Sequence, residues 1–249
     1  MWAVWQAEAY KYFKTKLWWG TLLLIAVPPL LNLLLWIEQM SREPQFVLTF
    51  AEASQQNLFL IAILFGPLVV CLLSTLSITS ETQNGTLRYV LTSQIKRWQL
   101  VLGKALWVLA WNSLLLLFAY LLNLALAAMF GASGTIPFVD TLLSWLVLSA
   151  SLAAMIPVYL LMSLLIPNFF VPVGFALVGT FLGLILSSSK YIAIYPFTSS
   201  TIFLMLLQGD KLEMELVGTL PVWIGVLCTL GIGGLLLTTI LFQRKDVAH

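Results

Sequence analysis

Residues 58–79 read LFLIAILFGPLVVCLLSTLSIT, a run of 22 residues without a charged side chain. Because a helix rises about 1.5 Å per residue, this run is long enough to cross the ~30 Å hydrocarbon core of a bilayer. The rest of the chain has the same character, since 61% of its 249 residues are hydrophobic and only 9% are charged. Water-soluble domains are far less apolar. The sequence therefore predicts an all-α, polytopic membrane protein.

Five further charge-free runs are long enough to span. The six predicted transmembrane helices cover residues 17–37, 58–79, 105–130, 141–166, 169–189 and 217–242. Short connections join them, so residues 1–249 are predicted to form a single transmembrane domain. Pro28, Pro29 and Pro157 lie inside runs, where a packed bundle tolerates the local kinks that they cause.

The basic residues predict the orientation of the spans. Of the 12 Lys and Arg residues, nine fall on one side of the predicted spans and three on the other. The nine are Lys11, Lys14, Lys16, Arg88, Lys96, Arg97, Lys104, Arg244 and Lys245, and the three are Arg42, Lys190 and Lys211. Since cytoplasmic loops carry the excess of basic residues, both termini are predicted to be cytoplasmic. The net charge of +2 hides this unequal distribution of basic residues between the two sides, and it does not indicate nucleic-acid binding.

The N-terminal residues 1–16 predict an interfacial helix. At helical spacing one face gathers Trp2, Trp5, Ala9, Tyr12 and Phe13. A helix with an aromatic face and a basic face is typical of the membrane surface. The alternative is a simple extension of the first span.

Residues that carry chemistry are scarce in this sequence. No predicted span has a charged residue at its centre, which disfavours an ion-coupled carrier. Cys71 and Cys228 both lie in apolar runs, and we interpret them as buried packing residues. The chain shows no metal-ligand spacing, nucleophile–base pair or phosphate loop, so no catalytic residue, metal or cofactor is predicted.

The stretch ETQNGTLRYVLTSQIKRWQLVLGK, residues 81–104, is polar and basic between two predicted spans. Asn84-Gly85 predicts a turn, and residues 86–91 predict a short helix before Thr92 or Ser93 caps the next one. So short a helix is not stable alone in water and needs a docking surface. That surface is either the anionic headgroups of the bilayer or a partner protein.

This stretch resembles the first cytoplasmic loop of ABC-2 type transporter permeases. The matching residues are Glu81, Gly85, Thr86, Leu87, Arg88, Leu91, Ser93, Ile95, Arg97, Gly103 and Lys104. Gln94 stands where the family commonly has proline, and Lys96 where it commonly has a small residue. Six spans and an N-terminal interfacial helix extend the resemblance over the whole chain.

The resemblance implies that residues 80–98 form a coupling segment, which rests in a cleft of a separate ATP-binding subunit. The residues expected to contact that subunit are Glu81, Gly85, Thr86, Leu87, Arg88, Leu91, Ile95 and Arg97. Glu81 and Arg88 are each expected to pair with an opposite charge of the partner. Two ATP-binding subunits and a second permease, either the same chain or a sister chain, would complete the transporter.

The connection at residues 190–216 is too apolar for a water-exposed loop. It resembles the re-entrant hairpin that such exporters carry before the final span, which implies a plug in the outer half of the path. The predicted external gate residues are Pro196, Ser199 and Phe203. The alternative is a loop folded over the outer surface of the bundle.

The predicted function is the membrane half of an ATP-driven exporter in the cell (inner, cytoplasmic) membrane. The short chain most resembles the small permeases of lantibiotic immunity and peptide-antibiotic resistance. Its expected substrate is amphipathic or lipid-associated: a peptide antibiotic, a drug or a lipid. The chain is not expected to be an enzyme, because ATP hydrolysis would belong to the separate subunit. The alternatives are a stand-alone ion-coupled carrier or channel and, less in keeping with the residues, an integral membrane enzyme.

Overall fold

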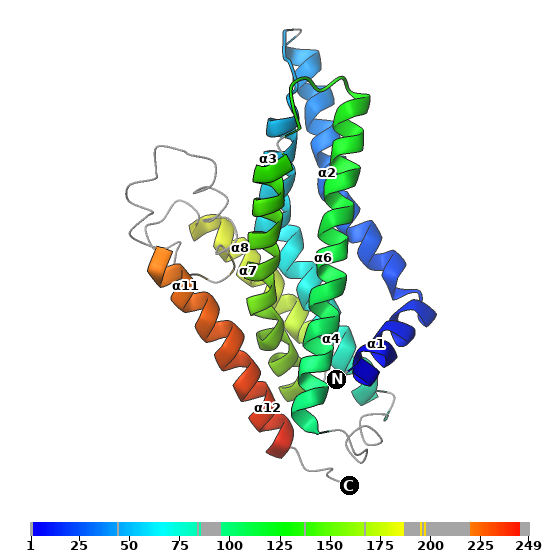
Figure 1. The fold of residues 1–249 in the computed structure, drawn as a ribbon, viewed down its shortest axis with the longest axis vertical. Helices are drawn as coiled ribbons and strands as arrows, with labels where there is room; N and C mark the ends of the chain where they lie inside the picture. Colours follow the sequence, from blue (N-terminus) through cyan, green and yellow to red (C-terminus); the bar gives the residue numbers. More distant parts are fainter. Residues whose placement is uncertain are drawn as a thin grey trace.

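The fold is a bundle of long helices, seen in a computed structural model that describes residues 2–43, 45–83, 85, 96–136, 138–166, 168–186, 195, 197 and 220–244. Its helices are α1 (Trp2–Lys14), α2 (Leu17–Arg42), α3 (Phe50–Leu60), α4 (Gly66–Gln83), α6 (Arg97–Met129), α7 (Phe138–Leu165), α8 (Phe170–Leu186), α11 (Leu220–Cys228) and α12 (Gly234–Arg244). Within the described residues the one β contact is an isolated bridge between Thr49 and Ser133. Figure 1 shows α1 and the end of α12 toward the same end of the bundle, which we call the α1 end.

Within the described part of the chain, five helical segments are long and apolar enough to cross a membrane. They are Leu17–Arg42, Phe50–Gln83, Arg97–Met129, Phe138–Leu165 and Pro221–Phe242. The predicted all-helical, multi-span architecture is thereby confirmed. The fifth predicted span, residues 169–189, stays a prediction, because α8 has 17 described residues and reaches only about 26 Å at 1.5 Å per residue.

Two helices extend beyond the predicted spans at the end opposite α1. Helix α2 continues to Arg42 instead of residue 37, and α3 begins at Phe50 instead of residue 58. A capping box starts α3, in which the Thr49 side chain accepts from the Glu52 backbone N–H and the Glu52 side chain accepts from the Thr49 backbone N–H. Hydropathy alone did not predict the added helical turns at the end of α2 and the start of α3, because polar residues such as Gln56 lie in them. The Trp36 indole donates to Gln56 Oε1 at 2.8 Å and ties the two helices together.

Each of two spans contains a π-helical turn that the sequence did not predict. Residues Ile61–Phe65 join α3 to α4, and Thr229–Gly233 join α11 to α12. The first turn directly precedes Gly66-Pro67, where proline lacks the N–H that a regular α-helix would use. A π-helical turn of this kind changes the direction of the helix axis without ending the helix.

Helix α7 lies between these two interrupted spans. A Cβ added at Gly66 would lie 2.8 Å from Leu152 Cδ1, and one added at Gly234 would lie 2.9 Å from Pro157 Cβ. Both glycines therefore let their helices approach α7 closely. The fully buried Tyr159 and Leu160 continue this contact toward the α1 end.

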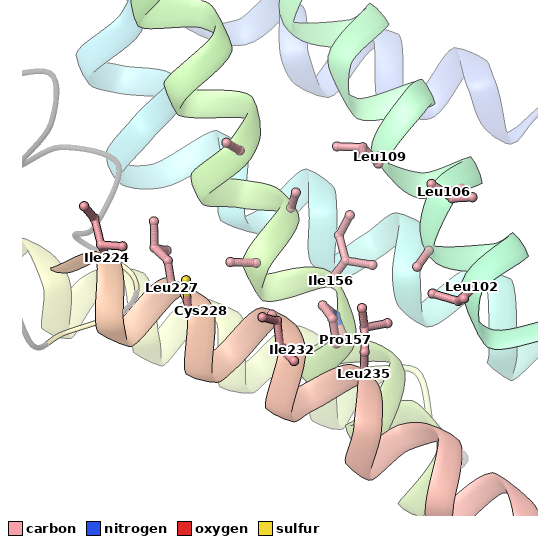
Figure 2. A pocket seen from close by; sticks show the side chains of 15 residues that line it. Leu102, Leu106, Leu109, Ile156, Pro157, Ile224, Leu227, Cys228, Ile232 and Leu235 are labelled. Carbon is pink, nitrogen blue, oxygen red and sulfur yellow. The ribbon is translucent and has the colours of Figure 1, made fainter. Parts of the chain in front are cut away.

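The last span leaves a cavity of about 480 Å³ between itself, α6 and α7. Figure 2 shows leucines of α6 on one side of it and side chains of α11 and α12 on the other. Cys228 lines this cavity and is exposed, so the expectation that it is a buried packing residue was wrong. Cys71 is buried as expected, and both thiols are free.

Candidate functional site

The predicted coupling segment is described at its two ends. Glu81, Gly85 and Arg97 belong to the described residues, whereas Thr86, Leu87, Arg88, Leu91 and Ile95 lie outside them. Helix α4 ends at Gln83, and Gly85 has a φ of 67°, a left-handed conformation that glycine adopts without strain. The helix therefore stops where a turn was predicted.

At the upstream end, Glu81 is buried, with only 8% of its surface exposed. Its Oε1 accepts a hydrogen bond from Lys104 Nζ at 2.7 Å and lies 3.5 Å from Lys11 Nζ. We expected Glu81 to pair with a charge of another protein, but here its carboxylate pairs with two lysines of its own chain. A contact between Glu81 and an ATP-binding subunit stays a prediction.

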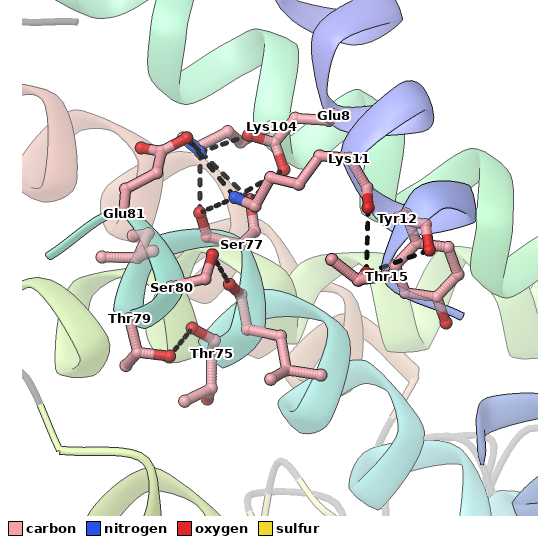
Figure 3. A network of polar contacts seen from close by, with 12 residues as sticks. Glu8, Lys11, Tyr12, Thr15, Thr75, Ser77, Thr79, Ser80, Glu81 and Lys104 are labelled. Atoms are coloured by element: carbon pink, nitrogen blue, oxygen red, sulfur yellow. Dashed lines mark hydrogen bonds and ion pairs between the residues drawn. The ribbon is translucent and has the colours of Figure 1, made fainter. Parts of the chain in front are cut away.

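Lys104 lies at the centre of this arrangement and is 1% exposed. Its ammonium donates to Glu8 Oε1 at 2.5 Å, to Glu81 Oε1 at 2.7 Å and to the Ser77 backbone oxygen at 2.7 Å. A lysine has three N–H donors, and a buried ammonium is costly unless they are satisfied. Figure 3 shows these contacts converging from three helices, α1, α4 and α6.

Glu8 and Lys11 complete the group from α1. Ser77 Oγ donates to Glu8 Oε2 at 3.0 Å, and Lys11 Nζ donates to the Ser77 backbone oxygen at 3.3 Å. We call Glu8, Lys11, Ser77, Glu81 and Lys104 the ion cluster. Its two carboxylates and two ammonium groups cancel in formal charge, so the cluster can be buried without a net charge.

The charges of the cluster change the pKa values of the groups on α1. Burial raises the pKa of Glu8, but the ammonium groups of Lys104 and Lys11 outweigh burial and hold this pKa below its ordinary value. Burial and the nearby Lys104 ammonium lower the pKa of Lys11, against the opposing effect of Glu8 and Glu81. The proximity of these four groups thus favours an ionised Glu8.

One helical turn after the ion cluster, aromatic side chains around Tyr12 hold α1 against its neighbouring helices. The Trp111 indole donates to Tyr12 Oη at 3.1 Å, and Tyr12 Oη lies 2.5 Å from Thr21 Oγ1. Burial raises the pKa of Tyr12 to about 12, so its hydroxyl stays protonated. The rings of Tyr12 and Trp107 meet edge to face, with 5.9 Å between their centroids. These contacts hold α1 on α2 and α6.

The downstream end of the segment is held differently. Arg97 Nη1 donates to the backbone oxygen of Phe242 at 2.7 Å. Phe242 lies in the last turn of α12, where helix carbonyls lack intrahelical partners and carry partial negative charge. An arginine there satisfies one such carbonyl. Residues 84–95 therefore connect two anchors, the ion cluster and the Arg97 contact.

Sequence reasoning missed Glu8 and Ser77. Glu8 lies three residues after Trp5 and four before Tyr12, so helical spacing puts it between two aromatic residues on one face. An acid in that place, on a helix with lysines, was an available signal. On the predicted aromatic face, Tyr12 is 5% exposed and packs on the bundle, whereas Trp2 is 67% exposed, and the interfacial placement of this helix stays a prediction.

The three predicted gate residues, Pro196, Ser199 and Phe203, lie outside the described residues. Their neighbours Tyr195 and Phe197 are described, and both contact the middle of α8. Tyr195 Oη donates to the Gly179 backbone oxygen at 2.8 Å, and Phe197 is 4% exposed. A Cβ added at Gly179 would overlap the Phe197 ring, so glycine makes room for it.

A family model described as ABC-2 family transporter protein matches residues 4–183. The matched range holds 180 of the 249 residues (183 − 4 + 1) and includes the whole ion cluster and Arg97. The chain belongs to the ABC-2 transporter family. No curated protein matches it.

Membership confirms the resemblance to ABC-2 permeases and makes the chain a multi-pass membrane permease subunit of an ABC transporter. ABC-2 permeases typically work with an ATP-binding subunit. In this ABC-2 permease, the segment expected to meet that subunit begins beside the ion cluster and ends at Arg97.

Proposed function

We propose that this ABC-2 permease is the membrane half of an ATP-driven exporter, with both termini in the cytoplasm and residues 80–98 docked on a separate ATP-binding subunit. Two such subunits and a second permease, the same chain or a sister chain, would form the transporter in the cell membrane. The chain itself would hydrolyse no ATP.

The observation that carries this proposal is the pair of anchors around the segment. Glu81 joins the upstream end to α1 and α6, and Arg97 joins the downstream end to α12. A segment that only served as a lipid-facing loop would need neither anchor. A segment that is pushed by an ATPase does need them, because a displacement reaches the bundle only through rigid connections.

The apolar character of the spans supports a proposal for the substrate class. A hydrated, charged solute needs polar side chains along its path to replace lost water. Among the described residues of the spans, the side chains near mid-depth are uncharged, and the polar ones there, such as Asn112 in the middle of α6, are buried within the bundle. We propose an amphipathic or lipid-associated substrate, such as a lantibiotic-type peptide, a drug or a lipid, which enters from the bilayer.

One observation favours a second candidate, a stand-alone ion-coupled carrier. Lys104 and Glu81 are buried charges in membrane-spanning helices, where such residues often move ions or protons. However, Glu81 lies in the last turn of α4, and every charge of the cluster has an opposite charge within 3.6 Å. A structural role at the end of the bundle fits this geometry better.

Reconstitution in vesicles tests the proposal. The chain is purified alone and together with the ATP-binding subunit encoded in the same genome, and both ATP hydrolysis and export are measured. We expect hydrolysis and export of an amphipathic peptide or fluorescent lipid only from the complex. ATP hydrolysis or ion flux by the chain alone would exclude the exporter-subunit proposal, and efficient export of a sugar alone would exclude the proposed substrate class.

A further inference from the structure

Two apolar pockets lie side by side on α6 at the α1 end. The first is the cavity of about 480 Å³ between α6, α7 and the last span, and it includes Ala153 and Ile156 of α7. The second, of about 450 Å³, lies between α1 and α6 and is lined by Trp2, Trp5 and Ala110 among others. We call them the tail pockets. Both volumes fall within the ~300–1,000 Å³ that is usual for ligand sites.

The two tail pockets share one wall. Leu106 and Leu109 of α6 line both of them, so these leucines form a ridge with one pocket on each side. Figure 2 shows both leucines on the α6 side of the first pocket. The second pocket covers residues 103–110 of α6, a length of about 10 Å at 1.5 Å per residue.

The chemistry of the lining selects an apolar ligand. Among the described residues that line the tail pockets, none is charged. Most are leucine, isoleucine, alanine or glycine, which offer no hydrogen bond from their side chains. An occupant must therefore bring hydrocarbon and keep its polar groups elsewhere.

The tryptophans indicate where the polar part of that occupant lies. The Trp2 and Trp5 rings stack with 5.0 Å between centroids, and Trp2 is 67% exposed. Indole rings favour the boundary between headgroups and hydrocarbon. The second pocket thus has one end at this boundary, and α6 continues from there toward the other leaflet.

We propose that the tail pockets hold the two hydrocarbon chains of one phospholipid, taken from the leaflet at the α1 end and retained by the folded protein. Two pockets of nearly equal volume with a common wall match two chains that one headgroup joins. A single-chain amphiphile would fill only one of them. The bound lipid would straddle α6 and contact α1 on one side and the last span on the other, independently of any exported substrate.

Native mass spectrometry of the full chain, purified in mild detergent, tests this assignment. Ala153→Phe fills the first pocket, Ala110→Phe fills the second, and Ala125→Phe is the matched control at an exposed position of α6 that lines neither. We expect one retained phospholipid per chain in the parent and the control, and its loss in either filled variant. The double variant should lose no more than each single one, because both pockets hold the same molecule.

Other outcomes would overturn the proposal. A parent protein without retained phospholipid would show that the pockets exchange freely with bulk lipid. Additive losses in the double variant would show two separate single-chain ligands. Loss from Ala125→Phe as well would show that retention does not depend on the pockets.

A second measurement uses the unchanged protein and does not depend on how the variants fold. Cys228 lines the first pocket and is exposed, whereas Cys71 is buried, so N-ethylmaleimide should react at Cys228. We expect faster alkylation after delipidation and slower alkylation when a diacyl phospholipid is added back. An alkylation rate that is the same with and without the phospholipid would contradict occupancy of this pocket.

Discussion

Replacing Lys104 by methionine removes the ammonium at the centre of the ion cluster while keeping most of the side-chain volume. Glu8 and Glu81 then face each other with only Lys11 to compensate both. Removing one partner of a buried ion pair costs about 3–5 kcal/mol, because the remaining charge stays buried and uncompensated. Lys104 is 1% exposed, so solvent screening does not reduce this cost much. For a chain of this size we expect the melting temperature to fall by roughly 6–20 °C.

A double variant separates charge balance from packing. Glu8→Gln with Lys104→Met leaves Glu81 and Lys11, which are 3.5 Å apart, as a balanced pair. We therefore expect the double variant to melt at a higher temperature than Lys104→Met alone. The assay is thermal unfolding of the purified chain in detergent, with Lys14→Met as the control at an exposed lysine. The reasoning is refuted if Lys104→Met melts like the control, or if the double variant melts below the single one.

Three further predictions address the segment, the gate and the pH range. Arg88→Glu should weaken binding of the ATP-binding subunit, measured by co-purification, while the melting temperature stays unchanged; equal co-purification would indicate a lipid-facing loop. Phe203→Asp should reduce vesicle export without reducing assembly of the complex, and unchanged export would argue against a plug. Because the pKa of Glu8 is held below its ordinary value of 4.5, its contribution to α1 docking should be complete above pH 4.5 and be lost only as the pH falls through the lower folded value. Tryptophan fluorescence of the purified chain measures this docking, and a Glu8-dependent transition near pH 6 would contradict the assignment.

The sequence predicted the five spans described above because the hydrocarbon core requires a minimum length of apolar helix, which can be counted in a sequence. It did not predict where α2 and α3 continue beyond the bilayer-length runs, since Gln56 and its polar neighbours look like a loop in hydropathy. Their helix depends on a capping box at Thr49 and on the indole of Trp36, which is distant in sequence. The π-turn before Gly66-Pro67 was not predicted either, because a proline in a helix indicates an interrupted hydrogen-bond ladder but not the form that the interruption takes.

The family was recognisable from residues 81–104, but the role of the charges in this stretch was not. Glu81 and Lys104 both matched the family pattern, and their spacing of 23 residues gave no reason to pair them. They meet because α4 and α6 run antiparallel on either side of the segment, which is a property of the fold. Glu8 joins them from 96 residues before Lys104, a distance over which sequence spacing predicts no contact.

The charged side chains of the ion cluster have a mechanical consequence for the helices that they join. Buried ion pairs are often no more stabilising than well-packed apolar residues, so stability alone does not explain the cluster. Apolar contacts weaken gradually as helices slide, whereas the Lys104 ammonium has three acceptors at 2.5–2.7 Å that only one alignment of α1, α4 and α6 supplies. A displaced segment must therefore either move these three helices together or break the cluster at a cost of several kcal/mol. Since Arg97 adds the end of α12 to the same unit, we expect a force on residues 84–95 to displace four helices as one body.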